Sequence, residues 1–306
     1  MPGAPEIGTI GKSRSPTHAG PLLTISRAVF VLVKAPLTLM AAFPAACAFL
    51  LSAEEHSFPQ FTLFLTGTLL SAFGAAALNQ WSEHPQDATM SRTRDRPIPA
   101  KLISPGCALM LGLILSGAGA GLLFAFFPLL AGILALTTIL LYWLVYTPLK
   151  RHTPWCTEVG AVAGALPALL GSAAGAGSIT PMGWSLFAIV FLWQMPHFHP
   201  IAWRYRTDYR QGGFRMLTVV DETGRKAANW SFIYALLLVA STAAPVFLGA
   251  GALYWVPATG VAAVFLQRAA AFRDFRRRDA AACSLFRFSL IYLAVLLSAL
   301  LIDHWT

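Results

Sequence analysis

Three oxygen-bearing side chains, Asn79, Glu83 and Asp87, recur at intervals of four residues at the end of a long apolar run. On a helix that turns about 100° per residue, they fall within an arc of roughly 80° and face the same way. Carboxylates at a membrane border are unfavourable unless a cation occupies the space between them. Carboxylate and amide oxygens are ligands of divalent metals such as Mg²⁺. The spacing therefore predicts a metal site at the mouth of a membrane-spanning helix.

A run of arginines follows this row of oxygen donors. Arg92, Arg94 and Arg96 come directly after it and precede Pro97. Guanidinium groups bind phosphate oxygens, and phosphate oxygens also bind Mg²⁺. A divalent metal that carries a phosphorylated ligand would therefore suit both the acids and the arginines.

The composition is that of a membrane protein. Hydrophobic residues make up 57% of the 306 residues and charged residues only 11%, whereas soluble domains have roughly 25% charged residues. A spanning helix needs about 20 mainly apolar residues. Nine segments approach or exceed this length: 28–51, 61–80, 104–126, 129–147, 156–177, 181–202, 230–249, 252–267 and 284–302. The predicted fold class is an all-α polytopic membrane protein with nine transmembrane helices.

The basic residues lie on one side of this predicted bundle. The 22 Lys and Arg residues fall near the N-terminus, in the loops after the second, fourth and sixth spans, and between or just inside the last two spans. The opposite connections and the C-terminus contain none. The positive-inside rule then makes the N-terminus cytoplasmic and puts the C-terminus across the membrane. Nucleic-acid binding is not expected, because the arginines are spread over loops without a recognisable module.

The chain ends and the cysteines add little chemistry. Residues 1–24 are rich in Pro, Gly, Ser and Thr, which predicts a disordered cytoplasmic tail, and residues 25–306 are predicted to form one transmembrane domain. No signal-peptide core precedes the first span, which is expected to insert and remain. The four cysteines are scattered without a C-x-x-C pair, which argues against a disulfide or zinc framework.

Two of the predicted cytoplasmic loops are long, 81–103 and 203–229. Both begin with polar residues that would continue the preceding helix. Long loops in a compact protein often carry function. Because both are on one side and rich in Arg and Asp, they suggest a cap over a cavity that opens to the cytoplasm.

The start of the second long loop contains two prolines and a charged pair. Pro196 and Pro200 are expected to bend or break the helix there. Asp208 lies four residues after Arg204, so the two could pair on one helical face. A plain interfacial salt bridge explains that pair as well as a functional role does.

Three motifs carry a resemblance to a known family. The first is Asn79-x-x-x-Glu83-x-x-x-Asp87-x-x-Met90-x-Arg92-Thr93-x-x-Arg96-Pro97. The second is Tyr146-Thr147-Pro148-Leu149-Lys150-Arg151. The third is Trp193-Gln194-x-Pro196-His197-Phe198, followed by Asp208-Tyr209-x-x-Gly212. Together they resemble the UbiA superfamily of intramembrane prenyltransferases, and within it the protoheme IX farnesyltransferases (haem O synthases), over residues 27–303.

The resemblance implies nine helices around a central cavity, open to the cytoplasmic side, where magnesium binds a prenyl diphosphate. Asn79, Glu83 and Asp87 would hold Mg²⁺ against the diphosphate, and Asp208 would serve a second metal. Arg204 stands where other members often carry a further carboxylate, which argues against a symmetrical two-metal site. The diphosphate oxygens would meet four basic side chains: Arg92, Arg96, Lys150 and Arg151.

The same resemblance implies farnesyl diphosphate and haem b as substrates, haem O as the product, membrane lipid as the surroundings, and haem-handling or terminal-oxidase assembly proteins as partners. His197 is the first candidate for contact with the haem iron and His199 the second. The alternative for His197 is a bond to a backbone carbonyl near Pro196. Aromatic rings could stabilise the farnesyl cation, and the candidates are Phe73, Trp81, Tyr142, Tyr146, Trp193 and Phe198.

Three positions depart from the family pattern, namely Cys156, Glu158 and Ser172. They leave open another acceptor, such as an aromatic quinone precursor or a chlorophyll-type ring. A rival of a different class is a transporter whose intramembrane acids couple ions. No inverted repeat or pair of broken helices supports it, and the acids sit at one interface rather than along a pathway.

Overall fold

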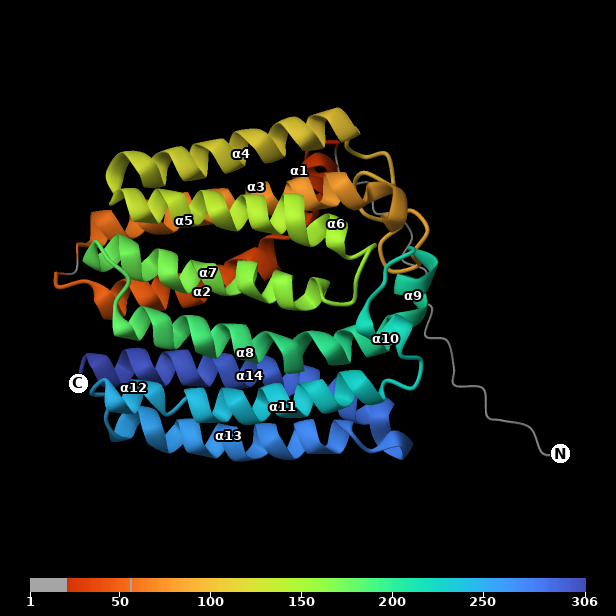
Figure 1. Cartoon of the computed structure of the whole chain (residues 1–306). Helices are drawn as coiled ribbons and strands as arrows, with labels where there is room; N and C mark the ends of the chain where they lie inside the picture. The colour runs from red at the N-terminus through yellow and green to blue at the C-terminus, as the bar shows by residue number, and fades with distance from the viewer. Residues whose placement is uncertain (1–20, 56) are drawn as a thin grey trace.

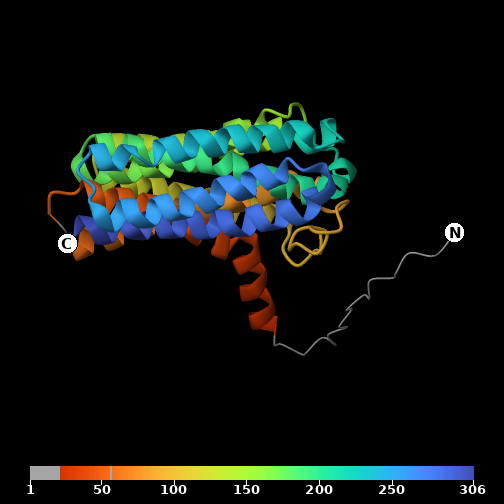
Figure 2. The ribbon, with the colours of Figure 1, turned by 90° about the horizontal axis from the view of Figure 1, so that it is seen from below.

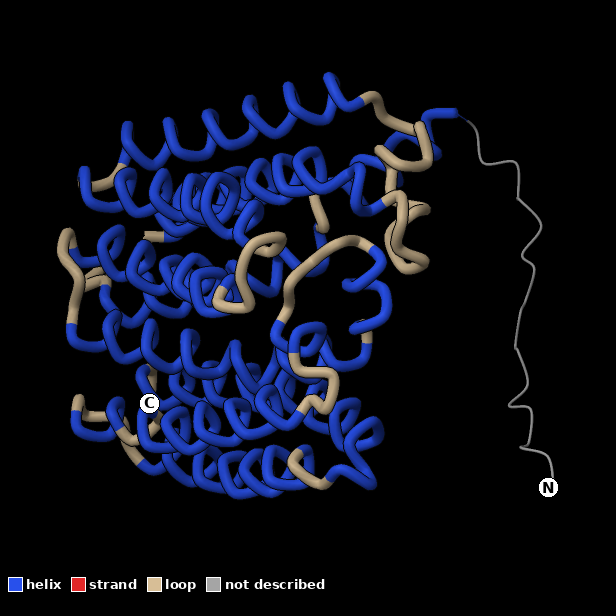
Figure 3. The backbone as a smooth tube through the Cα atoms, turned by 45° about the vertical axis from the view of Figure 1, so that its right-hand side comes forward, coloured by secondary structure: helices blue, strands red, loops and turns tan. Residues whose placement is uncertain are grey.

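The computed structural model describes residues 21–55 and 57–306. Within these ranges the chain forms helices, turns and loops and no strand (Figure 3), so the all-α prediction is confirmed. Residues 1–20 of the predicted tail lie outside the described part of the chain. Residues 21–24 form the first turn of helix α1 (Pro21–Leu32).

Each of the nine predicted spans is mostly helical, although 28–51 and 230–249 are interrupted by turns. Seven runs among the described residues are long and apolar enough to cross a membrane: α2 (Ala35–Ser52), α3 (Phe58–Asp87), α4 (Pro105–Phe126), the run Leu129–Leu149, α7 (Cys156–Ala176), the run Arg225–Phe247 and the run Phe275–His304. Two further long helices, α8 (Pro181–Arg204) and α13 (Ala252–Phe272), lie beside them (Figure 1) but are less apolar.

Three of the seven runs are composite. The run Leu129–Leu149 contains α5 (Leu129–Leu140), the π-helical η1 (Leu141–Tyr146) and α6 (Thr147–Leu149). The run Arg225–Phe247 contains α11 (Arg225–Ser241) and α12 (Ala244–Phe247). The run Phe275–His304 contains the short 3₁₀ turn η2 (Phe275–Arg277) and α14 (Arg278–His304).

The long helices pack side by side through small residues. α3 packs against α4, α2 against α7, and α8 against α7, α11 and α14. A Cβ added at Gly119 in α4 would clash with the Ser71 amide nitrogen in α3, and one at Gly171 in α7 would clash with the Ala45 carbonyl in α2. Close backbone approach of this kind stabilises helix pairs in lipid, where burial of apolar side chains gives no driving force.

The first predicted span, 28–51, is wrong as a single helix. Lys34 adopts a left-handed backbone conformation, φ 51° and ψ 43°, between α1 and α2. Pro36, in the first turn of α2, has no N–H to donate to the Leu32 carbonyl, so an uninterrupted helix would lose that bond. Figure 2 shows the result, with α1 leaving the bundle at a steep angle.

One end of the bundle carries a cap. The segment 88–104, α9 (Arg206–Gln211) and α10 (Leu217–Val220) meet there, while the short connections and the C-terminus lie at the other end (Figure 1). A small apolar cluster fastens the cap to the ends of α7 and α8, and its members are Met90, Cys156, Ala202, Phe214 and Met216.

Helix α8 does not break at its prolines. It continues through Pro196 and Pro200 to Arg204 and is interrupted only at Tyr205, with φ −104° and ψ 22°. Because α7, α11 and α14 all pack against α8, the surrounding helices hold the chain in place where the missing N–H groups weaken the helix. Of the two expected effects, a break at the prolines is therefore wrong, and a bend there stays a prediction.

Candidate active site

The row Asn79, Glu83 and Asp87 lies inside the protein. Helix α3 continues past the predicted end at residue 80 to Asp87, and this extension keeps the three side chains on one face. They are 0%, 6% and 1% exposed. Buried carboxylates need partners of opposite charge, so the groups facing them define the site.

Both carboxylates are paired with predicted diphosphate-binding residues. The Lys150 Nζ lies 2.7 Å from Glu83 Oε1, and an Arg96 guanidinium nitrogen lies 2.7 Å from Asp87 Oδ2. Lys150 follows α6 directly, whereas Arg96 returns from the 88–104 segment. The Lys150 ammonium also lies 4.4 Å from the centre of the Tyr146 ring. The structure thus brings together five of the residues that the sequence singled out, namely Glu83, Asp87, Arg96, Lys150 and Tyr146.

A lysine that the sequence analysis counted only as a topological charge completes the row. Lys34 Nζ donates to Asn79 Oδ1 at 2.6 Å. The Asn79 amide donates in turn to Thr147 Oγ1 at 2.9 Å, and Gln80 donates to the carbonyls at the end of α1. The sequence contains a signal for this contact. Lys34 stands just before Ala35 and Pro36 in an apolar stretch, and a proline at this place favours a helix break, where a polar side chain can leave the apolar surface.

The two lysines differ in their charge. Burial lowers the pKa of Lys34 to about 7, and the charges of Arg96 and Lys150 act in the same direction. Burial acts against the ammonium of Lys150 too, but the Glu83 carboxylate holds the pKa of Lys150 well above its usual value. The Glu83 carboxylate therefore favours the charged form of Lys150, whereas burial and the neighbouring cations disfavour the charged form of Lys34.

Asp208 and Arg92 lie in the cap. Asp208 Oδ1 accepts bonds from the Ser91 hydroxyl at 2.6 Å and the Ser91 amide at 3.3 Å. The Arg92 guanidinium stacks 4.7 Å from the centre of the Tyr205 ring and donates to the Tyr209 hydroxyl at 3.4 Å. These contacts join α9 to the 88–104 segment above the buried row.

Other predicted contacts are arranged differently. Arg151 is exposed beside Lys150. Arg204 does not pair with Asp208, because Tyr205 interrupts the helix between them, and its guanidinium instead contacts Cys283 Sγ at 3.6 Å. The expectation of an Arg204–Asp208 pair on one helical face is therefore wrong.

The two predicted haem-binding histidines face other helices. His197 Nδ1 lies 2.7 Å from Ser289 Oγ in α14, and its ring stacks on Trp193 with centroids 4.5 Å apart. His199 Nδ1 lies 3.1 Å from Ser231 Oγ in α11, and its Nε2 is buried without a hydrogen-bond partner. The contacts of the acidic row run instead to α6, to Lys34 and to the 88–104 segment.

The three positions that depart from the family pattern all lie in α7. The buried Cys156 thiol lies 3.6 Å from Met216 Sδ. Ser172 Oγ accepts from the Thr180 amide at 2.9 Å, at the turn between α7 and α8. Glu158 in α7 has one buried carboxylate oxygen without a hydrogen-bond partner.

The donor set fits a hard divalent cation. Asp87 Oδ1 is buried and has no hydrogen-bond partner, although Oδ2 is paired with Arg96. Over residues 21–55 and 57–306, no group of three or more His, Cys, Asp or Glu side chains is close enough to hold a metal. A metal here would thus need the Asn79 amide oxygen beside the two carboxylates, and amide and carboxylate oxygens are what Mg²⁺ accepts.

Known proteins are similar to this chain in sequence and in fold. The chain is 42% identical to a protoheme IX farnesyltransferase of Opitutus terrae, over 89% of this chain and 93% of the relative. A solved structure titled for digeranylgeranylglyceryl phosphate synthase superposes with a TM-score of 0.76 at 18% identity, covering 92% of this chain and 98% of the other. A UbiA homologue from Archaeoglobus fulgidus, bound to GPP and Mg²⁺, superposes with a TM-score of 0.66 at 14% identity, covering 89% and 99%.

The match also holds at the level of the family. The model of the UbiA prenyltransferase family matches residues 41–291, which include α3 with its acidic row and α8 with its histidines. The two solved structures, at these low identities, support the fold alone. On the family match and the 42% identical relative, this chain belongs to the UbiA prenyltransferase family.

Proposed function

We propose that this protein transfers the farnesyl group of farnesyl diphosphate to a vinyl group of haem b and so forms haem O, the haem that terminal oxidases need. The 42% identity to a protoheme IX farnesyltransferase over nearly the whole chain supports the choice of substrates. The observation that carries the chemistry is the buried row Asn79, Glu83 and Asp87, with Lys150 and Arg96 paired to it.

The row is the proposed binding site for the leaving group. Asn79, Glu83 and Asp87 would hold Mg²⁺, which would neutralise charge on the departing diphosphate. Lys150 and Arg96, freed from the carboxylates, would contact the diphosphate oxygens where negative charge develops. The carbon–oxygen bond of the allylic diphosphate breaks, and the bonding electron pair leaves with the diphosphate.

The aromatic rings beside the row have a role in the second half of the reaction. Tyr142 and Tyr146 stand with ring centroids 5.3 Å apart next to Lys150, where they can shield an allylic cation from water and stabilise it through their π faces. The vinyl group of haem b supplies the electron pair for the new carbon–carbon bond. Water then adds to the resulting cation and loses a proton, which leaves a hydroxyethylfarnesyl substituent.

The cap and the histidines complete the proposal. Arg92 and Arg151 would serve the outer diphosphate oxygens, and Asp208 would hold a second metal, or hold the cap through Ser91 when none is bound. His197 and His199 are the proposed contacts for haem iron.

The proposed setting is a bacterial-type cytoplasmic membrane. All nine long helices would span it, with the capped end and the N-terminus cytoplasmic and the C-terminus on the other side. The segments 88–104 and 205–224 carry Arg and Lys at the capped end (Figure 1), as the positive-inside rule requires. Haem-handling or oxidase-assembly proteins are the proposed partners.

The test is direct. Purified protein is incubated with haem b, farnesyl diphosphate and Mg²⁺, and the porphyrin product is analysed by mass spectrometry. A hydroxyethylfarnesyl product that appears only with all three components is the expected result. Prenylation of an aromatic quinone precursor or a chlorophyll-type ring in parallel reactions, with haem b left unchanged, would contradict the choice of acceptor.

A further inference from the structure

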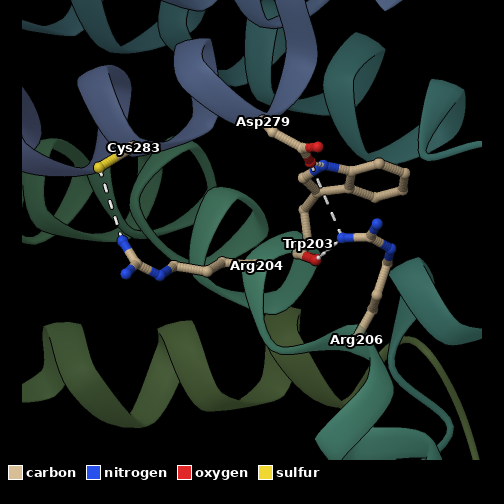
Figure 4. Close-up of a pocket in the computed structure, with 5 residues that line it drawn as sticks. All are labelled: Trp203, Arg204, Arg206, Asp279 and Cys283. Atoms are coloured by element: carbon tan, nitrogen blue, oxygen red, sulfur yellow. Dashed lines mark hydrogen bonds and ion pairs between the residues drawn. The ribbon is translucent and has the colours of Figure 1, made fainter. Parts of the chain in front are cut away.

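Two adjoining hollows lie away from the acidic row, where the end of α8 meets α13 and α14. The first has a volume of about 340 Å³ and is lined by Trp203, Arg204, Arg206, Asp279 and Cys283 (Figure 4). The second has a volume of about 440 Å³ and shares Cys283 with the first. Its other lining residues include Arg268, Ser284, Arg287, Phe288 and Ile291. We call the two together the arginine groove.

The groove has an excess of positive charge. Its four arginines face a single carboxylate, Asp279, which already accepts a bond from Trp203 Nε1 at 2.7 Å and lies 3.9 Å from Arg206. Figure 4 shows this acid beside the indole and the Arg206 guanidinium, while Arg204 points the other way, toward Cys283. The described residues thus leave most of the groove's guanidinium charge without a carboxylate.

The three remaining arginines have weak or neutral partners. Arg204 contacts only a thiol sulfur, at 3.6 Å, and the ring of Tyr205. Arg268 donates to Ser284 Oγ, but its Nε is buried without a partner. Arg287 is exposed and forms no ion pair with any acid in the described part of the chain. Guanidinium groups with free donors recognise phosphate and carboxylate oxygens.

The other wall of the groove is apolar. Phe288 lies under the Arg268 guanidinium, at 4.8 Å from ring centroid to guanidinium carbon. Ile291, one turn further along α14, is 52% exposed. α13 lies at one edge of the bundle (Figure 1) and α14 packs against it, so the exposed side of this wall would contact lipid in a membrane. The fitting ligand therefore has an anionic head for the arginines and an apolar chain for the wall.

We propose that the arginine groove binds the phosphate head of an anionic phospholipid, with an acyl chain along Phe288 and Ile291. Basic pockets between transmembrane helices at the cytoplasmic side are suited to such headgroups. A free phosphate would gain nothing from the apolar wall, and a zwitterionic lipid would bring its own cation to the arginines. The site is separate from the acidic row, so it does not depend on the proposed transferase reaction.

Cys283 provides a reporter, because it lies where the two hollows join. Cys47 and Cys156 are buried and Cys107 is exposed, so in a Cys107→Ser background a maleimide reports on Cys283. The detergent-purified protein is labelled with and without phosphatidylglycerol, phosphatidylcholine or inorganic phosphate. Labelling should slow about fourfold when phosphatidylglycerol reaches three times its Kd, since only the unliganded fraction reacts. Phosphatidylcholine and phosphate should leave the rate unchanged.

Charge-matched variants complete the test. Arg268→Gln with Arg287→Gln should abolish protection by phosphatidylglycerol, whereas Arg276→Gln with Arg277→Gln, in the exposed turn before α14, should preserve it. If the first variant exposes additional thiols and so has unfolded, Arg287→Gln alone replaces it, because this exposed side chain holds no other element. Equal protection by phosphatidylcholine, protection that survives in the groove variant, or stronger protection by farnesyl diphosphate or haem b would overturn the lipid assignment.

Discussion

Asp87→Asn removes one carboxylate charge from the acidic row and keeps the shape of the side chain. In the structure, Asp87 Oδ2 lies 2.7 Å from the Arg96 guanidinium, and the side chains are 1% and 21% exposed, respectively. The substitution therefore breaks a nearly buried ion pair. It also replaces one of the three proposed metal ligands, a carboxylate, by an amide. The two consequences differ in size, so they can be measured separately.

The structural consequence follows from the pair itself. Two unit charges 2.7 Å apart attract by about 6 kcal/mol at an effective dielectric constant of about 20. The desolvation of both groups offsets most of this, and Arg96 keeps some contact with solvent, so we expect a net loss of about 1–3 kcal/mol in the free energy of unfolding. Arg96→Gln should cost a similar amount, and the double variant should cost less than the sum of the two.

The chemical consequence should be larger and should not be symmetric. Loss of Asp87 as a proposed metal ligand should lower kcat for prenyl transfer by about 10³-fold, whereas loss of Arg96, a proposed contact of the diphosphate, should lower it by about 10–100-fold. The assay is single-turnover farnesyl transfer to haem b, with thermal unfolding measured on the same samples. Two results together would refute the metal-ligand role and leave the pair purely structural. The two single variants would lose the same amount of activity, and the double variant would be no less stable than either single variant.

Three further changes probe the surroundings of the row. Lys34→Met removes the ammonium that holds the Asn79 amide and should lower transfer by about 10–100-fold, with the thermal midpoint nearly unchanged; an unaltered rate would contradict its positioning role. Asp208→Asn weakens the bond between α9 and the 88–104 segment and should speed limited proteolysis of the cap. An unchanged cleavage rate would show that Asp208 does not hold the cap in place. Gly119→Ala should destabilise the α3–α4 contact by about 1–3 kcal/mol. Gly117→Ala, which meets open space, should leave the thermal midpoint unchanged or raise it slightly, because Ala is the better helix former.

The sequence predicted the helices and the acidic row because both signals are local. Apolar runs of the right length mark the long helices. Four of them, α4, α5 to α6, α7 and α8, have bounds within two residues of the prediction, whereas polar or charged ends extend α3, α13 and α14 by five to seven residues. The row follows from the period of the helix, since offsets of four keep side chains on one face wherever that helix lies. The motif with Lys150 also followed from the sequence, but only through resemblance to a family, because nothing local links position 150 to position 83.

The contacts that were missed depend on how distant segments meet. The Lys34–Asn79 bond joins residues 45 positions apart, and the Asp208–Ser91 bond joins residues 117 apart. The expected Arg204–Asp208 pair failed for a different reason. A rule that holds within one helix was applied across Tyr205, where the backbone leaves the helical conformation.

Charge balance gives Lys34 a reason to be in the site. Glu83 and Asp87 are matched by Lys150 and Arg96, so these four residues are close to neutral before any ligand arrives. A prenyl diphosphate carries about three negative charges at neutral pH and Mg²⁺ carries two positive ones, so the pair would bring a net charge of about −1 into a buried space. Lys34 is the one further cation bonded to the row, through Asn79, among the residues that the structure describes. Burial and the neighbouring cations lower the pKa of Lys34, and the added negative charge of the ligand would act in the opposite direction and favour its ammonium form. The left-handed break between α1 and α2, which is absent from a continuous span, is what brings this cation to the proposed binding site of the leaving group.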